Sequence, residues 1–380
     1  MERDELAAWL RLALAPGFGN IAARKLLAAF GLPQVLFAQS LAALSQLLSP
    51  AQAKALLAEP PGLHGLVEAT WQWLEEDRVQ RRLLTLADKG YPQALLDTED
   101  PPLMLYLMGQ PLAQWPPAIS IVGSRNPTPQ GVTNAREFAR SFAQAGFTVV
   151  SGMALGIDTA AHEGALDVST PGRIATLAVV GTGLDRVYPK RNLALAHRIV
   201  AQGLIISEYP IGTPPLASNF PKRNRIISAL GQGTVVVEAA LQSGSLITAR
   251  LANEQGKDVF AIPGSIHSAQ SRGCHALIKQ GAKLVETAQD VLEELSAPGS
   301  TRVRPADPAG DEGAESETEA QTEHGDSLLE ALGFDPVSLD AIVARTGIAP
   351  STLQARLLEL ELDGEVSRLP GGLFQRIGAA

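Results

Sequence analysis

Ten consecutive residues near the middle of the chain carry side chains that could contact both phosphate groups and nucleobases. Residues 219–228 read Asn-Phe-Pro-Lys-Arg-Asn-Arg-Ile-Ile-Ser. Cations on a short segment can neutralise phosphate charge, and a nearby Phe ring can stack an unpaired base at roughly 1–3 kcal/mol per base. The alternative for such a charge run is a solvated turn before a helix. The candidate binding residues in this segment are Phe220, Lys222, Arg223, Asn224 and Arg225.

Turns rich in Gly and Ser follow several apolar runs in the same part of the chain. Gly and Ser let the backbone approach a ligand closely and supply N–H and O–H donors without bulk. A single turn of this kind is ordinary, but their recurrence beside cations favours a site for a polyanion or a nucleotide. We expect backbone amides in the first two of these turns to bind phosphate. The turn residues are Gly123, Ser124 and Arg125, then Ser151 and Gly152, then Ser243, Gly244 and Ser245.

Short apolar runs alternate with helical stretches between residues 118 and 295. The runs are nearly continuous in Val and Ile, which is typical of strands covered on both faces, as in a parallel sheet between helix layers. The carboxyl ends of such strands share one crevice, so the Gly- and Ser-rich turns should meet there. The predicted strands are Ala118–Val122, Phe147–Val150, Ala175–Val180, Leu204–Ile206, Thr234–Val237, Val259–Ile262 and Lys283–Val285.

The remaining chain divides by composition into three further segments. Residues 1–85 are rich in Ala and Leu at helical spacing and predict a small helical domain. Its stretch Leu14–Ile21 is similar to a helix-hairpin-helix turn, which grips one backbone phosphate, although two core helices joined by a Gly turn would read the same way. An extended Rossmann domain is predicted at 86–296, a disordered acidic linker at 297–326 and a winged helix at 327–380.

The formal net charge of −9 is concentrated near the C-terminal end. Residues 302–326 hold eight acidic residues against two arginines, and residues 327–380 hold seven against four, so the first 301 residues are neutral. A local basic cleft is therefore compatible with the composition, whereas a broad cationic face for duplex DNA is not expected. The acidic residues near Arg356 likewise favour a protein contact over DNA reading by the winged helix. With no export signal, no stretch near the roughly 20 apolar residues of a membrane span and one cysteine, we expect a cytoplasmic protein without a metal site.

Two enzymatic interpretations stay open beside the binding one. Asp158 and His162 lie four residues apart on one predicted helix face and could form an acid/base pair or half of a metal site; the simpler reading is a histidine held by the aspartate or by the neighbouring turn. Residues 231–234, Gly-Gln-Gly-Thr, precede Glu238 much as in nucleotide phosphoribohydrolases, with the Glu one residue later than in that motif. Such an enzyme, with Glu208 or Glu238 as acid/base, is the alternative function. A phosphate-binding P-loop is excluded because no lysine is followed by Ser or Thr.

Seven ordered segments together resemble the DprA (Smf) family, the DNA-processing proteins of natural transformation. The resemblance spans nearly the whole chain and implies a Rossmann domain that binds single-stranded DNA, protects it and loads the recombinase RecA onto it during recombination in competent cells. It implies no catalytic turnover and no cofactor. The segments are Ile121–Arg125, Ser151–His162, Ser207-Glu208, Phe220–Leu230, Val237–Ala249, Phe260–Ser265 and Gly273–Val285.

The resemblance also assigns roles to individual residues. It places Arg125, Phe220, Arg223 and Arg225 in the DNA pocket, so an Arg223→Ala, Arg225→Ala double change should lower DNA affinity without unfolding the sheet. The family often has a lysine three positions before the Phe, where this chain has Ala217, so that phosphate contact is absent or comes from Lys222. Family members form homodimers through the end of the Rossmann domain. The matching segment here contains His275 and Leu284.

Overall fold

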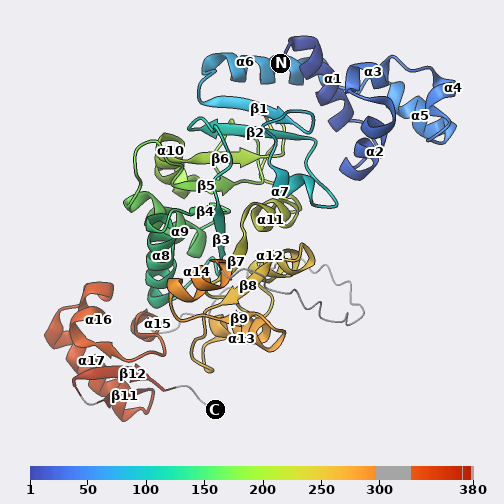
Figure 1. Ribbon diagram of the computed structural model, residues 1–380. Helices are drawn as coiled ribbons and strands as arrows, with labels where there is room; N and C mark the ends of the chain where they lie inside the picture. Colours follow the sequence, from blue (N-terminus) through green and yellow to red (C-terminus); the bar gives the residue numbers. More distant parts are fainter. Residues whose placement is uncertain (297–326, 370, 378–380) are drawn as a thin grey trace.

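A mixed sheet of nine strands forms the centre of the protein (Figure 1). The computed structural model describes residues 1–296, 327–369 and 371–377, so the predicted linker at 297–326 lies outside the described residues. The strand order is β1-β2-β6-β5-β4-β3-β7-β8-β9; β1, β2 and β6 pair antiparallel, and all other neighbours are parallel. The strands are β1 (Arg81–Thr85), β2 (Met104–Gly109), β3 (Ala118–Val122), β4 (Thr148–Ser151), β5 (Thr176–Val179), β6 (Leu204–Ser207), β7 (Gly233–Val236), β8 (Asp258–Ala261) and β9 (Lys283–Leu284).

All seven strands predicted from apolar runs are present, with ends shifted by at most one residue. The antiparallel strands β1 and β2 were missed. β1 reads Arg-Arg-Leu-Leu-Thr, carries no continuous apolar run, and lies inside the stretch 1–85 that was predicted to be helical. It belongs to the sheet because each of its five residues pairs with a residue of β2.

Helices cover both faces of the sheet, as the continuous apolar strands predict (Figure 1). Ile119 and Ile121 of β3 pack with Phe142 on one face, while Val122 packs with Ile227 on the other. The first face carries α8 (Pro129–Gln144), α9 (Ile157–Asp167), α10 (Leu193–Gln202) and α14 (Ala288–Ser296), and the second carries α7 (Gln93–Leu96), α11 (Asn219–Leu230), α12 (Gly244–Glu254) and α13 (Arg272–Lys279).

The chain reverses its winding direction between β3 and β7. From β3 it proceeds outward through β4, β5 and β6, then returns to place β7 on the other side of β3. The loop after β3 leads to α8 on one face, and the loop after β7 leads to α12 on the opposite face. In open parallel sheets this switch point opens a crevice outside the carboxyl ends of the strands, where ligands bind.

Smaller modules lie at the two ends of the chain (Figure 1). The N-terminal helices form their own core with Leu103 and Met104. They are α1 (Arg3–Ala13), α2 (Asn20–Phe30), α3 (Pro33–Phe37), α4 (Leu41–Leu44), α5 (Pro50–Leu57) and α6 (Leu63–Glu76). Across the described residues, none of the helices is both long enough and apolar enough to span a membrane.

The C-terminal module has the helices and the small sheet of a winged helix. Its strands are ordered β10-β12-β11 and pair antiparallel. The ring of Phe334 lies 6.4 Å, centroid to centroid, from His267 in the loop after β8, so the module touches the central domain near the carboxyl edge of the sheet. The elements are α15 (Ser327–Leu332), β10 (Val337–Ser338), α16 (Leu339–Thr346), α17 (Pro350–Leu362), β11 (Val366–Leu369) and β12 (Leu373–Arg376).

Candidate nucleic-acid interface

Arg223 on α11 is buried at the carboxyl edge of the sheet. Its side chain donates from Nη1 to the carbonyl oxygen of Val179 at the end of β5, at 2.9 Å. The guanidinium lies against Gly152, where an added Cβ would stand 1.7 Å from Nη1. Burial lowers the pKa of Arg223 to about 10, while the charge of Asp158 opposes the shift, so the guanidinium stays charged at pH 7.

Asp158 holds the turn after β4 from the other side. Its Oδ2 accepts hydrogen bonds from the backbone N–H groups of Gly152 (3.1 Å) and Ala154 (3.2 Å). Burial raises the pKa of the Asp158 carboxyl, and the charge of Arg223 opposes that rise. Between them Met153 adopts φ +58°, a conformation that costs a non-Gly residue energy and persists only where its surroundings fix it. Asp158, through these hydrogen bonds, and Arg223, through its packing against Gly152, therefore hold the Ser151–Ala154 turn from two sides.

Arg225, two residues further along α11, is paired with carboxylates. Its guanidinium contacts Glu208 at 2.5 Å and Asp100 at 3.2 Å, and its side chain is 16% exposed. Burial raises the pKa of Glu208, and the charge of Arg225 opposes the shift. The sequence predicted a cation directed at phosphate. The structure places Arg225 in an ion pair that also links α11 to the loop after β6.

The exposed cations of the predicted set are Arg125, after β3, and Lys222, on the first turn of α11. Arg125 lies close enough to Arg223 for its charge to lower the pKa of Arg223. Phe220 is half-buried and packs over Gly181, where an added Cβ would stand 3.1 Å from its ring. The structure thus places Arg125 near the buried Arg223, and Phe220 and the exposed Lys222 on the first turn of the helix that carries Arg223.

Two predicted amide donors already have partners within the protein. The Ser124 N–H donates to the carbonyl oxygen of Glu238 at 2.7 Å, which joins the loops after β3 and β7, and the Gly152 N–H donates to Asp158. The Ser151 hydroxyl donates to Ile121 within the sheet. A Cβ on Gly123 would stand 2.7 Å from the Ile157 side chain. These turn residues therefore shape the crevice by close backbone packing.

The Ser243–Ser245 turn lies on the opposite side of the switch point. Ser243 caps α12 by accepting from the Ser245 N–H, and the two hydroxyl oxygens are 2.7 Å apart. The Asn224 amide donates to the Gly244 carbonyl oxygen at 3.4 Å. This contact places the start of α12 beside the predicted binding segment of α11.

His162 is a buried structural histidine. Its Nδ1 is 2.7 Å from the Thr176 hydroxyl, which itself donates to the Val149 carbonyl oxygen, so Nδ1 must carry the proton given to Thr176. Burial lowers the pKa of His162 to about 3. His162 is therefore hydrogen-bonded to Thr176 on β5 and not to Asp158 or to the turn after β4. No group of three His, Cys, Asp or Glu side chains suited to a metal ion occurs in the described ranges.

Glu238, the candidate acid/base residue, caps the helix that follows β3. One carboxylate oxygen accepts from the Thr128 N–H at 2.9 Å and the other from the Thr128 hydroxyl at 2.6 Å. Burial raises the pKa of Glu238, and the two Thr128 contacts oppose the rise. A Cβ on Gly131 would stand 2.4 Å from the carboxylate carbon, so the carboxylate is packed against α8. This geometry is that of a structural cap.

The predicted dimer residues lie at the far end of the sheet. Leu284 is on the edge strand β9 and is 51% exposed. The His275 Nε2 on α13 lies 3.1 Å from the Gly264 carbonyl oxygen in the loop after β8. The two residues occupy neighbouring elements at the β9 edge, away from Phe220.

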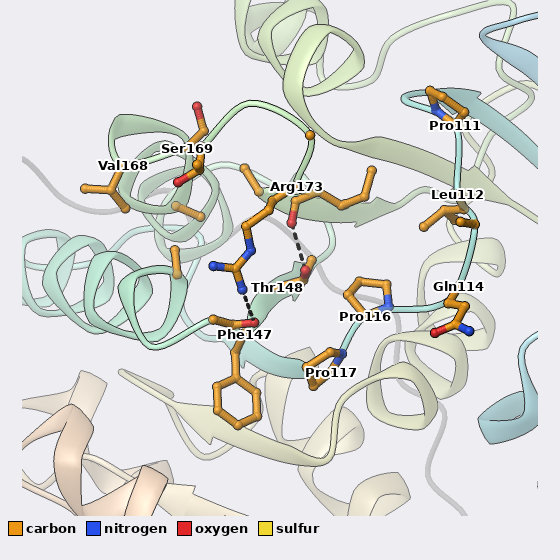
Figure 2. A pocket seen from close by; sticks show the side chains of 18 residues that line it. Pro111, Leu112, Gln114, Pro116, Pro117, Phe147, Thr148, Val168, Ser169 and Arg173 are labelled. Carbon is orange, nitrogen blue, oxygen red and sulfur yellow. Dashed lines mark hydrogen bonds between the residues drawn. The ribbon is translucent and has the colours of Figure 1, made fainter.

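A cavity of about 250 Å³ lies at the opposite, amino end of the strands (Figure 2). Pro116, Pro117 and Phe147 contribute to its lining, and Arg173 beside it donates to the Gly146 carbonyl oxygen at 2.8 Å. None of the predicted site residues lines this cavity. The predicted interface is therefore separate from this cavity.

Tyr188 lies beside Phe220 and was not among the predicted site residues. It is 46% exposed in the loop after β5, and its ring centroid lies 5.5 Å from that of Phe220. A signal was available, because residues 188–192 read Tyr-Pro-Lys-Arg-Asn and residues 220–224 read Phe-Pro-Lys-Arg-Asn. The aromatic residues that open these two matching pentapeptides are in contact.

Comparison with known proteins agrees with this architecture. Residues 82–296 match the family model for DNA recombination-mediator protein A, and residues 312–372 match the DprA winged helix domain. Protein Smf of Synechocystis is 38% identical over 334 residues, which cover 80% of this chain and 83% of that protein. Protein Smf of Escherichia coli is 39% identical over 307 residues, which cover 80% of each chain.

Two solved structures are also similar. The X-ray structure of DNA processing protein A from Streptococcus pneumoniae matches with a TM-score of 0.62 and 38% identity, covering 75% of this chain and 95% of that one. DNA processing protein A from Helicobacter pylori, solved for its single-stranded DNA binding mode, matches with a TM-score of 0.51 and 34% identity, covering 56% and 95%. This chain belongs to the DNA recombination-mediator protein A (DprA) family, whose members act in DNA processing.

Proposed function

We propose that this protein binds single-stranded DNA in the crevice at the β3–β7 switch point and acts as a recombination mediator. The observation that carries the proposal is that the exposed Arg125 lies near the buried Arg223, whose helix also carries Phe220 and the exposed Lys222 on its first turn. Phosphates would contact the exposed cations, while a base would stack beside Phe220. Such contacts address backbone and ring faces, so binding should be salt-dependent and tolerant of sequence.

Beyond binding, the proposed role is to protect incoming DNA and load RecA recombinase onto it during natural transformation, as a cytoplasmic homodimer and without catalytic turnover. Support comes from membership of the family and from the exposed Leu284 on the edge strand β9, which offers an unpaired edge for self-association. A Leu284→Asp variant should shift the molar mass measured by light scattering towards that of a monomer.

The direct test is fluorescence anisotropy with labelled single-stranded and duplex oligonucleotides at two salt concentrations. A preference for the single strand that weakens with salt is expected. Absence of binding to both forms would refute the proposal. RecA loading is then measured as RecA ATPase activity on single strands precoated with single-strand-binding protein, with and without this protein. No gain in rate would limit the function to DNA binding.

A further inference from the structure

We propose that the loop 184–192 forms a second half of the single-strand site, in which Tyr188 stacks a base and Lys190 and Arg191 contact phosphates. This inference rests on the proposed function and extends the site beyond the residues discussed there. Its starting point is the pair of matching pentapeptides at 188–192 and 220–224. Each combines an aromatic ring with two adjacent cations, which is the combination that binds single strands without sequence preference.

The structure brings the two pentapeptides to the same edge of the sheet. The rings of Tyr188 and Phe220 lie 5.5 Å apart, centroid to centroid, with an interplanar angle of 36°. Each pentapeptide also lies at the start of a helix, because α10 begins at Leu193 and α11 at Asn219. A strand that crosses the crevice beside Phe220 would therefore meet the second set of side chains next.

The two rings differ in solvent exposure, and this difference assigns them different roles. Phe220 is half-buried and bounded by Gly181, where even a Cβ would stand 3.1 Å from its ring. Tyr188 is 46% exposed and so presents more ring surface to an incoming base. Phe220 then acts largely as the support on which the Tyr188 ring rests.

The cations of the 188–192 segment are also more exposed than those of the 220–224 segment. Arg223 is buried and fixes the Ser151–Ala154 turn, whereas its counterpart Arg191 is exposed, as are Lys190 and Lys222. The 184–192 loop therefore offers two exposed cations where the α11 segment offers one. Arg186 beside them is paired with Asp185 and is not assigned to the site.

The loop is held in place at both ends, so Tyr188 is presented on a fixed backbone. Near one end, the Asp185 carboxylate accepts from the Gly212 N–H at 2.8 Å. At the other end, the buried Asn192 amide donates to the Met153 carbonyl oxygen at 2.9 Å and to the Thr159 hydroxyl at 3.0 Å. Preorganisation of this kind lowers the ordering cost of binding.

The test measures anisotropy of a labelled oligo(dT) with the full-length protein and its variants. Tyr188→Ala should weaken binding by about five-fold to about a hundred-fold, the equivalent of one lost base stack. Tyr188→Phe should bind as the wild type does, while Tyr188→Leu, which keeps apolar bulk but no ring, should behave as Tyr188→Ala. Val79→Ala, a change at a 67% exposed apolar side chain near the start of β1, is the matched control and should have no effect.

A second readout identifies stacking itself. An oligo(dT) with abasic positions should bind the wild type more weakly than intact oligo(dT), and this penalty should shrink with Tyr188→Ala, because both changes remove the same contact. Full additivity of the two effects would overturn the stacking role. So would near-normal binding of Tyr188→Ala. If the wild type binds the oligonucleotide, either of these results refutes only the stacking role of Tyr188 and leaves the proposed single-strand binding function standing. If the wild type does not bind, both the stacking role and the proposed function are refuted.

The charge of the loop is tested through the salt dependence. Lys190→Ala with Arg191→Ala should reduce the slope of log K against log salt by about 1.4, since each single-strand phosphate contact contributes about 0.7. Lys54→Ala, an exposed cation of the N-terminal helices, should leave the slope unchanged. An unaltered slope in the double variant would overturn the path of the strand along this loop.

Discussion

The guanidinium of Arg223 occupies the space that a side chain at residue 152 would need. A Cβ on Gly152 would stand 1.7 Å from Nη1 and 2.3 Å from Cζ of Arg223. Only glycine fits at residue 152, because any side chain there would collide with Arg223. The Arg223 guanidinium in turn joins α11 to β5 and to the turn after β4. The two sequence motifs that carry these residues act as one structural unit.

The Gly152→Ala substitution should displace Arg223 from Val179 and from the neighbourhood of Asp158. Overpacking costs about 1–3 kcal/mol, and an uncompensated buried charge adds to that loss. Urea unfolding should therefore show a stability loss of about 3 kcal/mol or more, and anisotropy should show weaker DNA binding. Gly65→Ala is a control, because a Cβ there meets open space in α6 and should be neutral or slightly stabilising. An unchanged urea midpoint for Gly152→Ala would contradict the packing described.

Alanine substitutions of Arg125 and Arg225 should distinguish an effect on DNA affinity from an effect on unfolding free energy. Arg125→Ala removes an exposed cation, so we expect weaker DNA binding and a change in unfolding free energy within about 0.5 kcal/mol. Arg225→Ala leaves Glu208 buried without its cation and should cost about 3–5 kcal/mol. Combining Arg225→Ala with Glu208→Gln should recover part of that loss. Wild-type stability of Arg225→Ala would show that the ion pair does not hold α11.

The burial of Arg223 and the ion pairs of Arg225 make their double substitution a poor test of DNA binding. The double change Arg223→Ala, Arg225→Ala was expected to leave the sheet intact. Burial of Arg223 and the two ion pairs of Arg225 instead predict a destabilised protein. Reduced DNA binding by that variant would not identify a DNA contact, so the exposed residues Arg125 and Lys222 are the better probes.

The predictability of each feature depended on how local its cause is. Continuous Val and Ile runs specify the central strands, because a strand that is buried on both faces needs apolar residues at every position of its own segment. The environment of Arg225 is set by Asp100, 125 residues upstream, and that of Arg223 by a glycine on another strand end. Strand β1 likewise depends on its pairing with β2. Segment composition carries no signal for such long-range contacts, whereas the repeated pentapeptide that reveals Tyr188 was visible in the sequence.

His162 should make the protein less stable as the pH falls. Its folded-state pKa is about 3, below the unfolded value near 6.5, so between these values the unfolded chain binds a proton that the folded protein does not. The stability contribution is complete above pH 6.5 and decreases by about 1.4 kcal/mol per pH unit below it. Between pH 6.5 and 5, urea unfolding should show that the wild type loses about 2 kcal/mol more than His162→Asn.

Comparison of these two proteins isolates the histidine. The carboxyl groups of Asp158, Glu208 and Glu238 have raised pKa values and contribute with the opposite sign, but they are present in both proteins and cancel in the difference. Asn can still donate to the Thr176 hydroxyl from its amide. Parallel pH profiles for the two proteins would indicate that His162 is protonated in the folded state.

Glu238 distinguishes the binding function from the enzymatic alternative. Both oxygens of Glu238 accept from Thr128, so Glu238→Gln removes the charge from these hydrogen bonds and requires the Thr128 hydroxyl to accept instead of donate. The change should cost about 1–2 kcal/mol in unfolding free energy. Thr128→Ala should cost a similar amount, and the two changes together should cost less than their sum, because they break the same contact. DNA affinity should persist in Glu238→Gln. Chromatography of nucleoside monophosphates incubated with the protein should detect no release of free base; release by the wild type that Glu238→Gln abolishes would instead establish a hydrolase and make the capping role secondary.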